Sequence, residues 1–283
     1  MTFPYLPRPT ELPLDPRQSL PTMYDLPFED PEEDGLPDTF HIDQPQLLEF
    51  TFLPPNWDEN QVFTATNLYL YYDVAHSRWY KRPNWFAAVG VSRLYEGHDM
   101  RFSYVIWQEQ VSPFVVVELL SPGTEDEDFG RTMQRQGRPP TKWQVYEQIL
   151  QVPYYFVFSR HTDELQAFHL INGRYQSVEL TCGQLLIPEL QLRLGLWQGD
   201  YKGMNRLWLR WFTADGELIL SPSERAILAE RQVIESQQKV IEFQQQVSEF
   251  QQQLSESQKQ VIAAQEKAER LAARLRELGI EPD

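Results

Sequence analysis

Short apolar runs recur through the middle of the chain at the length and spacing of β-strands. Five of them lie between residues 61 and 160, at 67–73, 85–91, 103–107, 114–120 and 154–160. The run Phe114–Leu120 is apolar at both alternating sets of positions, which is typical of a central strand that is covered on both sides. The pattern therefore predicts a sheet with Phe114–Leu120 in its interior.

One amphipathic helix is predicted between the last two of these runs. The segment Pro139–Val152 is bounded by prolines and has apolar residues at helical spacing, namely Trp143, Tyr146, Ile149 and Leu150. Strand, helix and strand in this order predict a βαβ unit with a right-handed crossover.

Two glycine-containing dipeptides predict hairpins further along. Asn172-Gly173 divides the run 165–180, and Asp215-Gly216 divides the run 207–220. Both dipeptides favour tight turns between paired strands. Together with the βαβ unit, they indicate an α/β or α+β domain with a mixed sheet and flanking helices over residues 61–223.

Residues 224–283 repeat every seven residues. Seven heptads starting at Val233 contain no proline, and no glycine before Gly279, which predicts a long coiled-coil helix. The alternative is one amphipathic helix that folds back onto its own domain. Valine at the first apolar position of the heptad favours a coiled coil of two helices if the helices are parallel. Serine and alanine at the second apolar position weaken the contact between the helices in places. The first positions are Val233, Val240, Val247, Leu254, Val261, Ala268 and Leu275, and the second positions are Ser236, Phe243, Phe250, Ser257, Ala264, Leu271 and Leu278.

Residues 1–60 differ in composition from the rest of the chain. They hold 12 of the 21 prolines and 13 acidic residues against two basic ones, which accounts for most of the net charge of −16. Proline removes backbone donors, and the acidic run Phe28–Asp38 repels itself, so we expect a partly extended or disordered arm. The alternative is an arm that docks onto a neighbour through its aromatic side chains. Its last part, Leu47–Pro55, is apolar enough to enter the folded domain.

Composition also excludes several classes of protein. The acidic excess argues against a purely electrostatic nucleic-acid binder, which needs a dense basic surface. No run of about 18 apolar residues is present, so we expect no membrane contact, and the N-terminus lacks the features of a signal peptide. The single cysteine, Cys182, rules out an intramolecular disulfide and a cysteine-based zinc site. A cytoplasmic protein is the expectation.

One acidic residue is the main candidate for chemistry. The sequence contains no phosphate-binding loop, zinc-protease motif, nucleophile elbow or dinucleotide fingerprint that would point elsewhere. Glu118 lies at the end of the most apolar run, where an unpaired buried charge is costly. Hard divalent cations prefer oxygen ligands, so Glu118 is a candidate metal ligand, with Asn84, Asp128 and Lys142 as candidate neighbours. The alternative is a strand-end glutamate that reaches solvent or a helix N-terminus.

A basic segment lies beside this candidate site. Between residues 131 and 142 the charged residues are all basic: Arg131, Arg135, Arg138 and Lys142. Such a segment can hold phosphate groups of a nucleic acid. A solvated loop is the alternative.

Four segments together resemble a known family. Pro83-Asn84, VVVELLSPGTEDED from Val115, TKWQVYEQI from Thr141 and VPYYFVF from Val152 look like the Uma-type putative restriction endonucleases, which belong to the PD-(D/E)XK nuclease superfamily. The resemblance covers about residues 60–215 and is strongest to the longer members, which have a Pro-rich arm and a charged helical tail.

The resemblance implies a restriction-endonuclease-like core that hydrolyses phosphodiesters of DNA with Mg²⁺ or Mn²⁺. It implies that Glu118, with Asn84, binds metal, and that Lys142 takes the lysine role because Leu120 occupies the usual position. Asp128 matches the acidic loop position of the family and is the third candidate metal ligand. The side chains of Asn84, Glu118 and Lys142 are then expected to meet around one pocket.

The sequence departs from the family pattern at Asn84, where the family has aspartate. Asparagine keeps the shape and one carbonyl oxygen but loses the negative charge that holds Mg²⁺ and polarises water. We therefore expect weak metal binding. Two interpretations follow: an impaired nuclease, or a fold reused as a non-catalytic module that binds nucleic acid through the basic segment or assembles proteins through residues 224–283.

Overall fold

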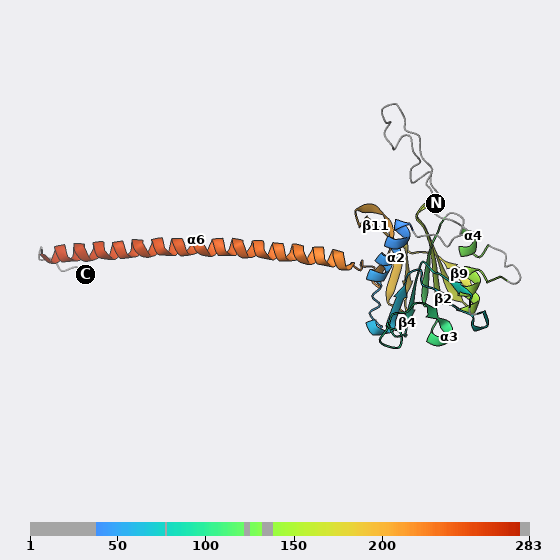
Figure 1. The fold of residues 1–283 in the computed structure, drawn as a ribbon. Coiled ribbons are helices and arrows are strands. Elements are labelled where there is room, and N and C mark those ends of the chain that lie inside the picture. The colour runs from blue at the N-terminus through green and yellow to red at the C-terminus, as the bar shows by residue number, and fades with distance from the viewer. Residues whose placement is uncertain (1–37, 77, 122–124, 132–137, 278–283) are drawn as a thin grey trace, which may run out of the picture. The chain divides into compact units, whose positions relative to one another are not determined.

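The computed structural model describes residues 38–76, 78–121, 125–131 and 138–277. The chain divides into two units, Met1–Ser221 and Pro222–Asp283 (Figure 1). Arg135 and most of the predicted N-terminal arm lie outside the described residues.

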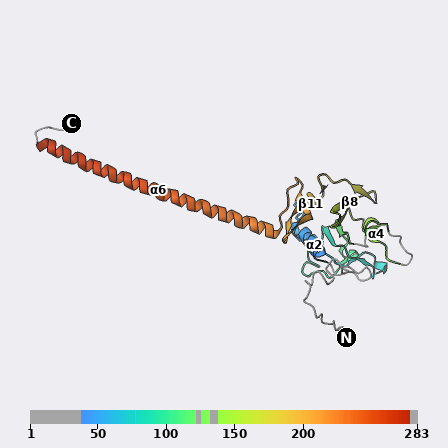
Figure 2. The ribbon, with the colours of Figure 1, turned by 90° about the horizontal axis from the view of Figure 1, so that it is seen from above.

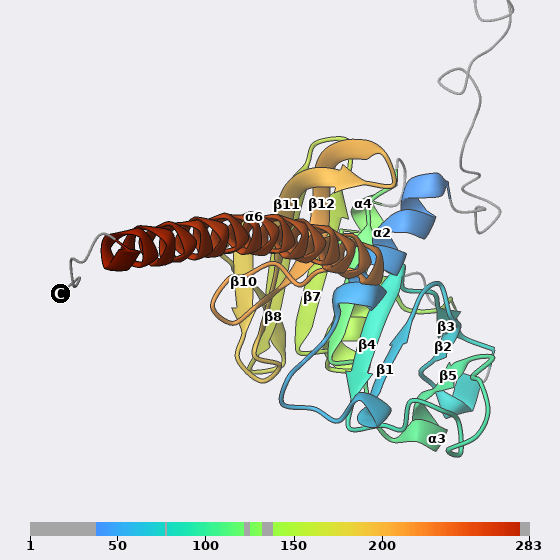
Figure 3. The ribbon, with the colours of Figure 1, turned by 90° about the vertical axis from the view of Figure 1, so that its left-hand side faces the viewer.

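A six-stranded mixed sheet forms the centre of the first unit (Figure 3). Every neighbouring pair is antiparallel except β6 and β7, which are parallel. The connection between these two contains α5 (Lys142–Gln144) and the π-helical turn η3 (Val145–Ile149), so the predicted βαβ unit is confirmed. The strands in spatial order are β1 (Val62–Ala65), β4 (Trp85–Val89), β6 (Val115–Leu119), β7 (Tyr154–Ser159), β8 (Glu164–Ile171) and β9 (Arg174–Val178).

Both faces of this sheet are covered, which explains why β4, β6 and β7 are buried along their whole length. One face packs against α2 (Thr39–Thr51) and a three-stranded sheet of β10 (Gln184–Ile187), β11 (Leu192–Tyr201) and β12 (Met204–Thr213). The other face packs against η3 and a small sheet of β3 (Tyr80–Lys81), β2 (Leu70–Tyr71) and β5 (Tyr104–Val105). The run Phe114–Leu120 is central, as predicted.

The folded domain begins earlier than residue 61. Residues 39–51, which we expected within a partly extended arm, form helix α2 with Leu47 and Leu48 fully buried. The Gln44 side chain donates to the Leu209 carbonyl and accepts from the Leu209 amide, both at 2.8 Å, so it acts as a strand neighbour of β12. Pro45 lies inside the helix, and the packing of its apolar face compensates for the missing donor.

The predicted hairpins have different outcomes. The hairpin at Asn172-Gly173 is confirmed, because β8 and β9 pair around it and both residues have positive φ. The turn at Asp215-Gly216 also forms, but the returning chain pairs only with the end of β12, through an antiparallel bridge from Leu218 to Phe212 and two backbone hydrogen bonds. The predicted strand pair over 207–220 is therefore confirmed only next to the turn. Instead β12 pairs along its whole length with β11.

The remaining elements are short. The runs at 67–73 and 103–107 contain only the two-residue strands β2 and β5. The helical turns are η1 (Glu59–Gln61), η2 (Val74–His76), α3 (Ile106–Glu109) and α4 (Glu125–Asp128).

The second unit contains α6 (Pro222–Glu277), a continuous helix of 56 residues (Figures 1 and 2). None of its side chains between residues 222 and 277 is buried. In the described part of the chain, no helix has the length and apolar character needed to cross a bilayer.

Candidate active site

Neighbouring strands bring Asn84 next to Glu118. In the antiparallel pair of β4 and β6, Trp85 lies opposite Val117, so the residues just beyond each are adjacent. The backbone N–H of Asn84 donates to Glu118 Oε2 at 3.3 Å, and the backbone N–H of Leu119 donates to the side-chain Oδ1 of Asn84 at 2.8 Å. The Asn84 side chain thus extends the strand ladder past the end of β4.

Lys142 reaches the same place from the crossover helix. Thr141 and Gln144 form a capping box that starts α5 at Lys142. Lys142 Nζ lies 3.1 Å from Glu118 Oε2 and 3.0 Å from Asp128 Oδ1. The two carboxylate side chains are 0% and 1% exposed and the lysine side chain is 19% exposed, so the ammonium of a partly exposed lysine bridges two buried acids. The structure therefore brings together Asn84, Glu118, Asp128 and Lys142.

Two tyrosines that are not among the predicted site residues support this centre. The Tyr146 hydroxyl donates to Glu118 Oε1 at 2.8 Å, and the Tyr155 hydroxyl donates to the Asp128 carbonyl at 3.0 Å. Tyr146 follows Lys142 by four residues, so both project from one side of the same helical segment. That spacing was the signal available in the sequence.

Burial and charge set the protonation of the centre. Burial raises the pKa of Glu118 to about 7, and the Asp128 charge adds to the rise, against the opposing effects of Lys142 and Tyr146. Burial disfavours the Lys142 ammonium, but the charges of Asp128 and Glu118 outweigh it and hold the lysine pKa above its usual range. Near neutral pH, Lys142 is charged and Glu118 is in part protonated.

The donor set fits a divalent cation poorly. Among the residues that the structure describes, no three or more His, Cys, Asp or Glu side chains are grouped to hold a metal ion. Glu118 and Asp128 provide two carboxylates, but the Lys142 ammonium already bridges them. Asn84 Oδ1 accepts a backbone hydrogen bond. A cation bound here would compete with Lys142, and the side chain at position 84, an asparagine, adds no negative charge to hold it.

The predicted nucleic-acid-binding residues lie apart from this hydrogen-bonded centre. Arg131 and Arg138 are exposed, and the Arg131 guanidinium lies 4.9 Å from the Phe129 ring centroid. Both fit a surface role better than a role in the buried charge pair. Arg135 is outside the described residues.

A second polar cluster anchors the end of β6 on its opposite face. His41 Nε2 lies 3.3 Å from the Leu119 carbonyl oxygen and 3.1 Å from Ser121 Oγ, while His41 Nδ1 lies 2.9 Å from Asp38 Oδ1. Arg160 Nη2 pairs with the other Asp38 oxygen at 2.7 Å. This cluster ties α2 to the strand that carries Glu118. Sequence reasoning missed it because both Asp38 and His41 fall in the expected arm.

Replacing Asp38 with asparagine should lower the free energy of unfolding of the full chain by about 1–2 kcal/mol at about pH 7. Burial opposes ionisation of Asp38, but hydrogen bonds from His41 and the Arg160 charge lower its pKa from 3.8 to about 2. Because the folded-state pKa is depressed, this stabilisation is present above the unfolded pKa and is lost as the pH falls from about 4 to about 2. Urea unfolding at several pH values measures the difference.

The matched control is Asp43→Asn. Asp43 also lies on α2, and its substitution removes the surface ion pair that it makes with Lys202. It should change stability by less than about 1 kcal/mol. A loss at Asp38 that stayed constant down to about pH 2 would contradict a charge-based role.

A comparison with protein-family models matches residues 33–205 of the chain to the model Uma2, described as "Putative restriction endonuclease". The match covers more than half of the chain and includes every residue of the centre. No curated protein matches the chain.

Proposed function

The chain belongs to the Uma2 family of putative restriction endonucleases, and we propose that it is an endonuclease-type phosphodiester hydrolase whose Mg²⁺- or Mn²⁺-dependent activity on DNA is impaired. The observation that carries this proposal is the meeting of Asn84, Glu118 and Lys142 at the ends of β4, β6 and the crossover helix. These are the positions that the family resemblance assigns to the catalytic centre. One of them, Asn84, is neutral where the family has an aspartate.

Each residue has a role that its contacts support. Of Glu118, Asp128 and Lys142, the lysine has the most exposed side chain, so we assign to its ammonium the contact with a phosphate oxygen of bound DNA. Glu118 and Asp128 hold that ammonium in position, and Tyr146 orients Glu118. A divalent cation, when bound to a nuclease, supplies an activated water and neutralises developing charge. Asn84 and the Lys142 bridge weaken the site for such a cation.

Wild-type protein should cleave plasmid DNA slowly with Mg²⁺ or Mn²⁺, and Glu118→Gln should reduce that cleavage by about tenfold or more. The substitution removes an anionic ligand but keeps an oxygen that can accept from Tyr146. Gel assays with Mg²⁺, Mn²⁺ or EDTA measure the rate. Glu164→Gln, on the exposed end of β8, is the control and should leave the rate unchanged. Rapid cleavage that survives Glu118→Gln would contradict this choice of residues.

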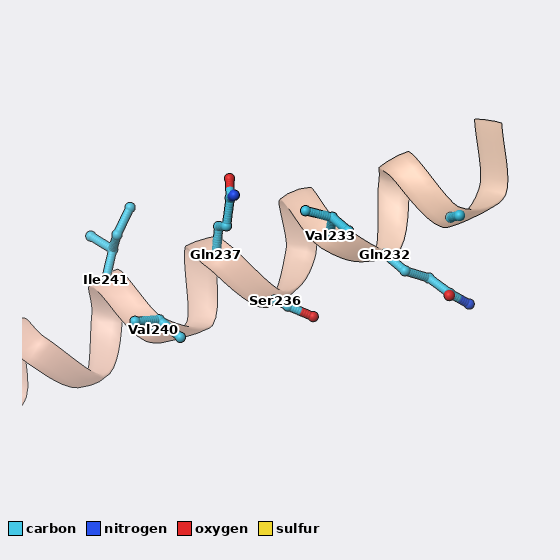
Figure 4. A pocket seen from close by; sticks show the side chains of 7 residues that line it. Gln232, Val233, Ser236, Gln237, Val240 and Ile241 are labelled. Carbon is cyan, nitrogen blue, oxygen red and sulfur yellow. The ribbon is translucent and has the colours of Figure 1, made fainter. Parts of the chain in front are cut away.

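The alternative function is a non-catalytic module that binds nucleic acid or assembles proteins through α6. A hollow on α6 favours the assembly part, because it is made entirely by one face of that helix (Figure 4). In the predicted heptads, Val233 and Val240 are successive first positions and Ser236 is the second position between them. With Gln237, these residues form the four-membered hole that receives one side chain of a partner helix. The residues that line the hollow are Ala229, Gln232, Val233, Ser236, Gln237, Val240 and Ile241.

The positions that flank this seam favour a second copy of α6 as the partner. The position after each second position is glutamine in five successive heptads, and the position before each first position is glutamine or lysine from residue 232 to residue 267. These flanks carry no acidic residue, so two copies meet there without repulsion between carboxylates. They also provide no pattern of opposite charges that would select a different chain. Self-association is therefore compatible with either function.

A further inference from the structure

The outer side of the small sheet carries a group of aromatic side chains. Tyr71 on β2 lies directly opposite Tyr80 on β3, with ring centroids 5.7 Å apart. Tyr69 lies 4.5 Å from Tyr80, and Trp107 lies 6.4 Å from Tyr71. We call Tyr69, Tyr71, Tyr80 and Trp107 the aromatic surface. Tyr69 is exposed and the other three are half-buried, whereas Leu70 and Tyr104 on the inner side are fully buried.

This surface needs an explanation because its rings contact one another and solvent rather than the core. Mutual edge-to-face packing fixes the rings in place, so little side-chain freedom would be lost if a flat ligand stacked on them. Such preorganised rings are suited to bind another flat ring system.

Positive charge accompanies the aromatic surface, although the whole chain has a net charge of −16. Residues 78–82 read Arg-Trp-Tyr-Lys-Arg, without an acidic residue. Arg78 is exposed, and the Arg82 guanidinium lies 5.2 Å from the Tyr69 ring centroid. Of the nearby acids, Glu127 pairs with Lys81 and Asp73 with His76, which stacks on Trp79. Basic side chains interleaved with rings favour a ligand with both phosphates and bases.

Strand β3, which carries Tyr80, connects the aromatic surface to the candidate active site along the chain. Strand β3 leads directly into Pro83-Asn84, and its inner residue Lys81 donates to Glu127 at 2.8 Å. Glu127 also accepts from the Lys142 amide at 3.2 Å and precedes Asp128 in the chain. These contacts link β3 to Lys142, so we expect a polynucleotide bound at Lys142 to extend toward the aromatic surface.

We propose that the aromatic surface binds unpaired bases, so that this site takes single-stranded nucleic acid, or the unpaired stretches that open within a supercoiled plasmid, in preference to fully paired duplex. This inference rests on the proposed function for the identity of the neighbouring centre. Exposed bases stack on tyrosine and tryptophan rings whatever their sequence, whereas the bases inside a duplex are covered by their neighbours. The exposed Arg78 then contacts the backbone phosphates.

The test measures binding of the full chain in EDTA, so that no cleavage is required. The fluorescent probes are oligonucleotides of about 20 nucleotides: oligo-dT, oligo-rU, a duplex of equal length, and an abasic strand that keeps the phosphates but has no bases. We expect oligo-dT to bind at least about tenfold more tightly than the duplex and the abasic strand. Comparison with oligo-rU distinguishes DNA from RNA.

The double variant Tyr69→Ala/Tyr71→Ala should weaken oligo-dT binding by about tenfold or more and leave duplex binding unchanged. Tyr69→Phe/Tyr71→Phe keeps both rings and should bind as the wild type does, which separates lost stacking from lost folding. Phe50→Ala, at an exposed aromatic residue of α2, is the control. Equal binding of all four probes, absence of binding, or oligo-dT binding that is insensitive to the alanine variant would overturn the inference.

These outcomes are independent of those for the proposed function. Base-dependent binding without cleavage by any variant would reject the proposed nuclease function and support base binding by the aromatic surface. Glu118-dependent cleavage without base-dependent binding would do the reverse.

Discussion

Replacing Asn84 with aspartate should raise Mg²⁺- or Mn²⁺-dependent cleavage of DNA by about 10- to 100-fold over the wild-type rate. The structure can accept this change, because one aspartate oxygen can still accept from the Leu119 amide while the backbone amide of residue 84 still donates to Glu118. The second oxygen then adds an anionic ligand beside Glu118 and Asp128. Three carboxylates attract a divalent cation strongly enough to compete with the Lys142 ammonium.

The pH dependence of this variant follows from the pKa of Glu118, which burial already raises to about 7. A new negative charge at residue 84 raises that pKa further in the metal-free protein. Because a cation binds the deprotonated carboxylate, cleavage should increase as the pH rises from about 6 to about 8. Initial rates of plasmid cleavage with Mg²⁺, Mn²⁺ or EDTA over this range measure the effect.

The control is Asn60→Asp, which adds the same charge at an exposed position of η1 and should not change the rate. Combination with Glu118→Gln should abolish the gain. An unchanged rate in Asn84→Asp, or a gain that persists in EDTA, would show that the missing charge is not what limits activity.

Much of this centre was predictable from local sequence. The apolar run that ends at Glu118 indicates a central strand, and the helix after it has to return across the sheet to reach the parallel strand β7. These two facts bring Lys142 near Glu118. Asn84 was a candidate neighbour of Glu118 because it lies at the start of another strand. The pairing of that strand with β6 depends on long-range contacts, so the residues alone do not predict that the two meet.

The bridging of Glu118 and Asp128 by Lys142 was not predictable, because it depends on the path of the chain through 121–141. The same limit applies to α2. Proline content argues against a helix in residues 1–60, but the burial of Leu47 and Leu48 and the pairing of Gln44 with β12 depend on residues about 160 positions away. Similarly, the Asp215-Gly216 turn forms as its local sequence indicates, whereas the true partner of β12 is β11.

The full chain should be a dimer or a higher oligomer, and removal of residues 222–283 should leave a folded monomer. In α6, Val240, Phe243, Val247 and Phe250 are 40–75% exposed, although they occupy the seam positions of two successive heptads. Burying one such side chain stabilises the assembly by about 1.5–3 kcal/mol, so a continuous exposed stripe of this kind strongly favours association. The two phenylalanines should form the tightest layers, with looser layers at Ser236 and Ser257.

The double variant Val247→Asp/Phe250→Asp places charges in the middle of this seam and should make the chain monomeric at tens of micromolar. Its matched control is Ser248→Asp/Gln252→Asp, which adds the same charges to the outer face of the same heptad and should stay oligomeric. Light scattering at low and high salt measures the mass, which should change little with salt because glutamine dominates the flanking positions. A monomeric full chain would reject self-association. If the seam variant stayed oligomeric while the truncation did not, α6 would still be the interface, but its contact face would be different from the one that the heptads predict.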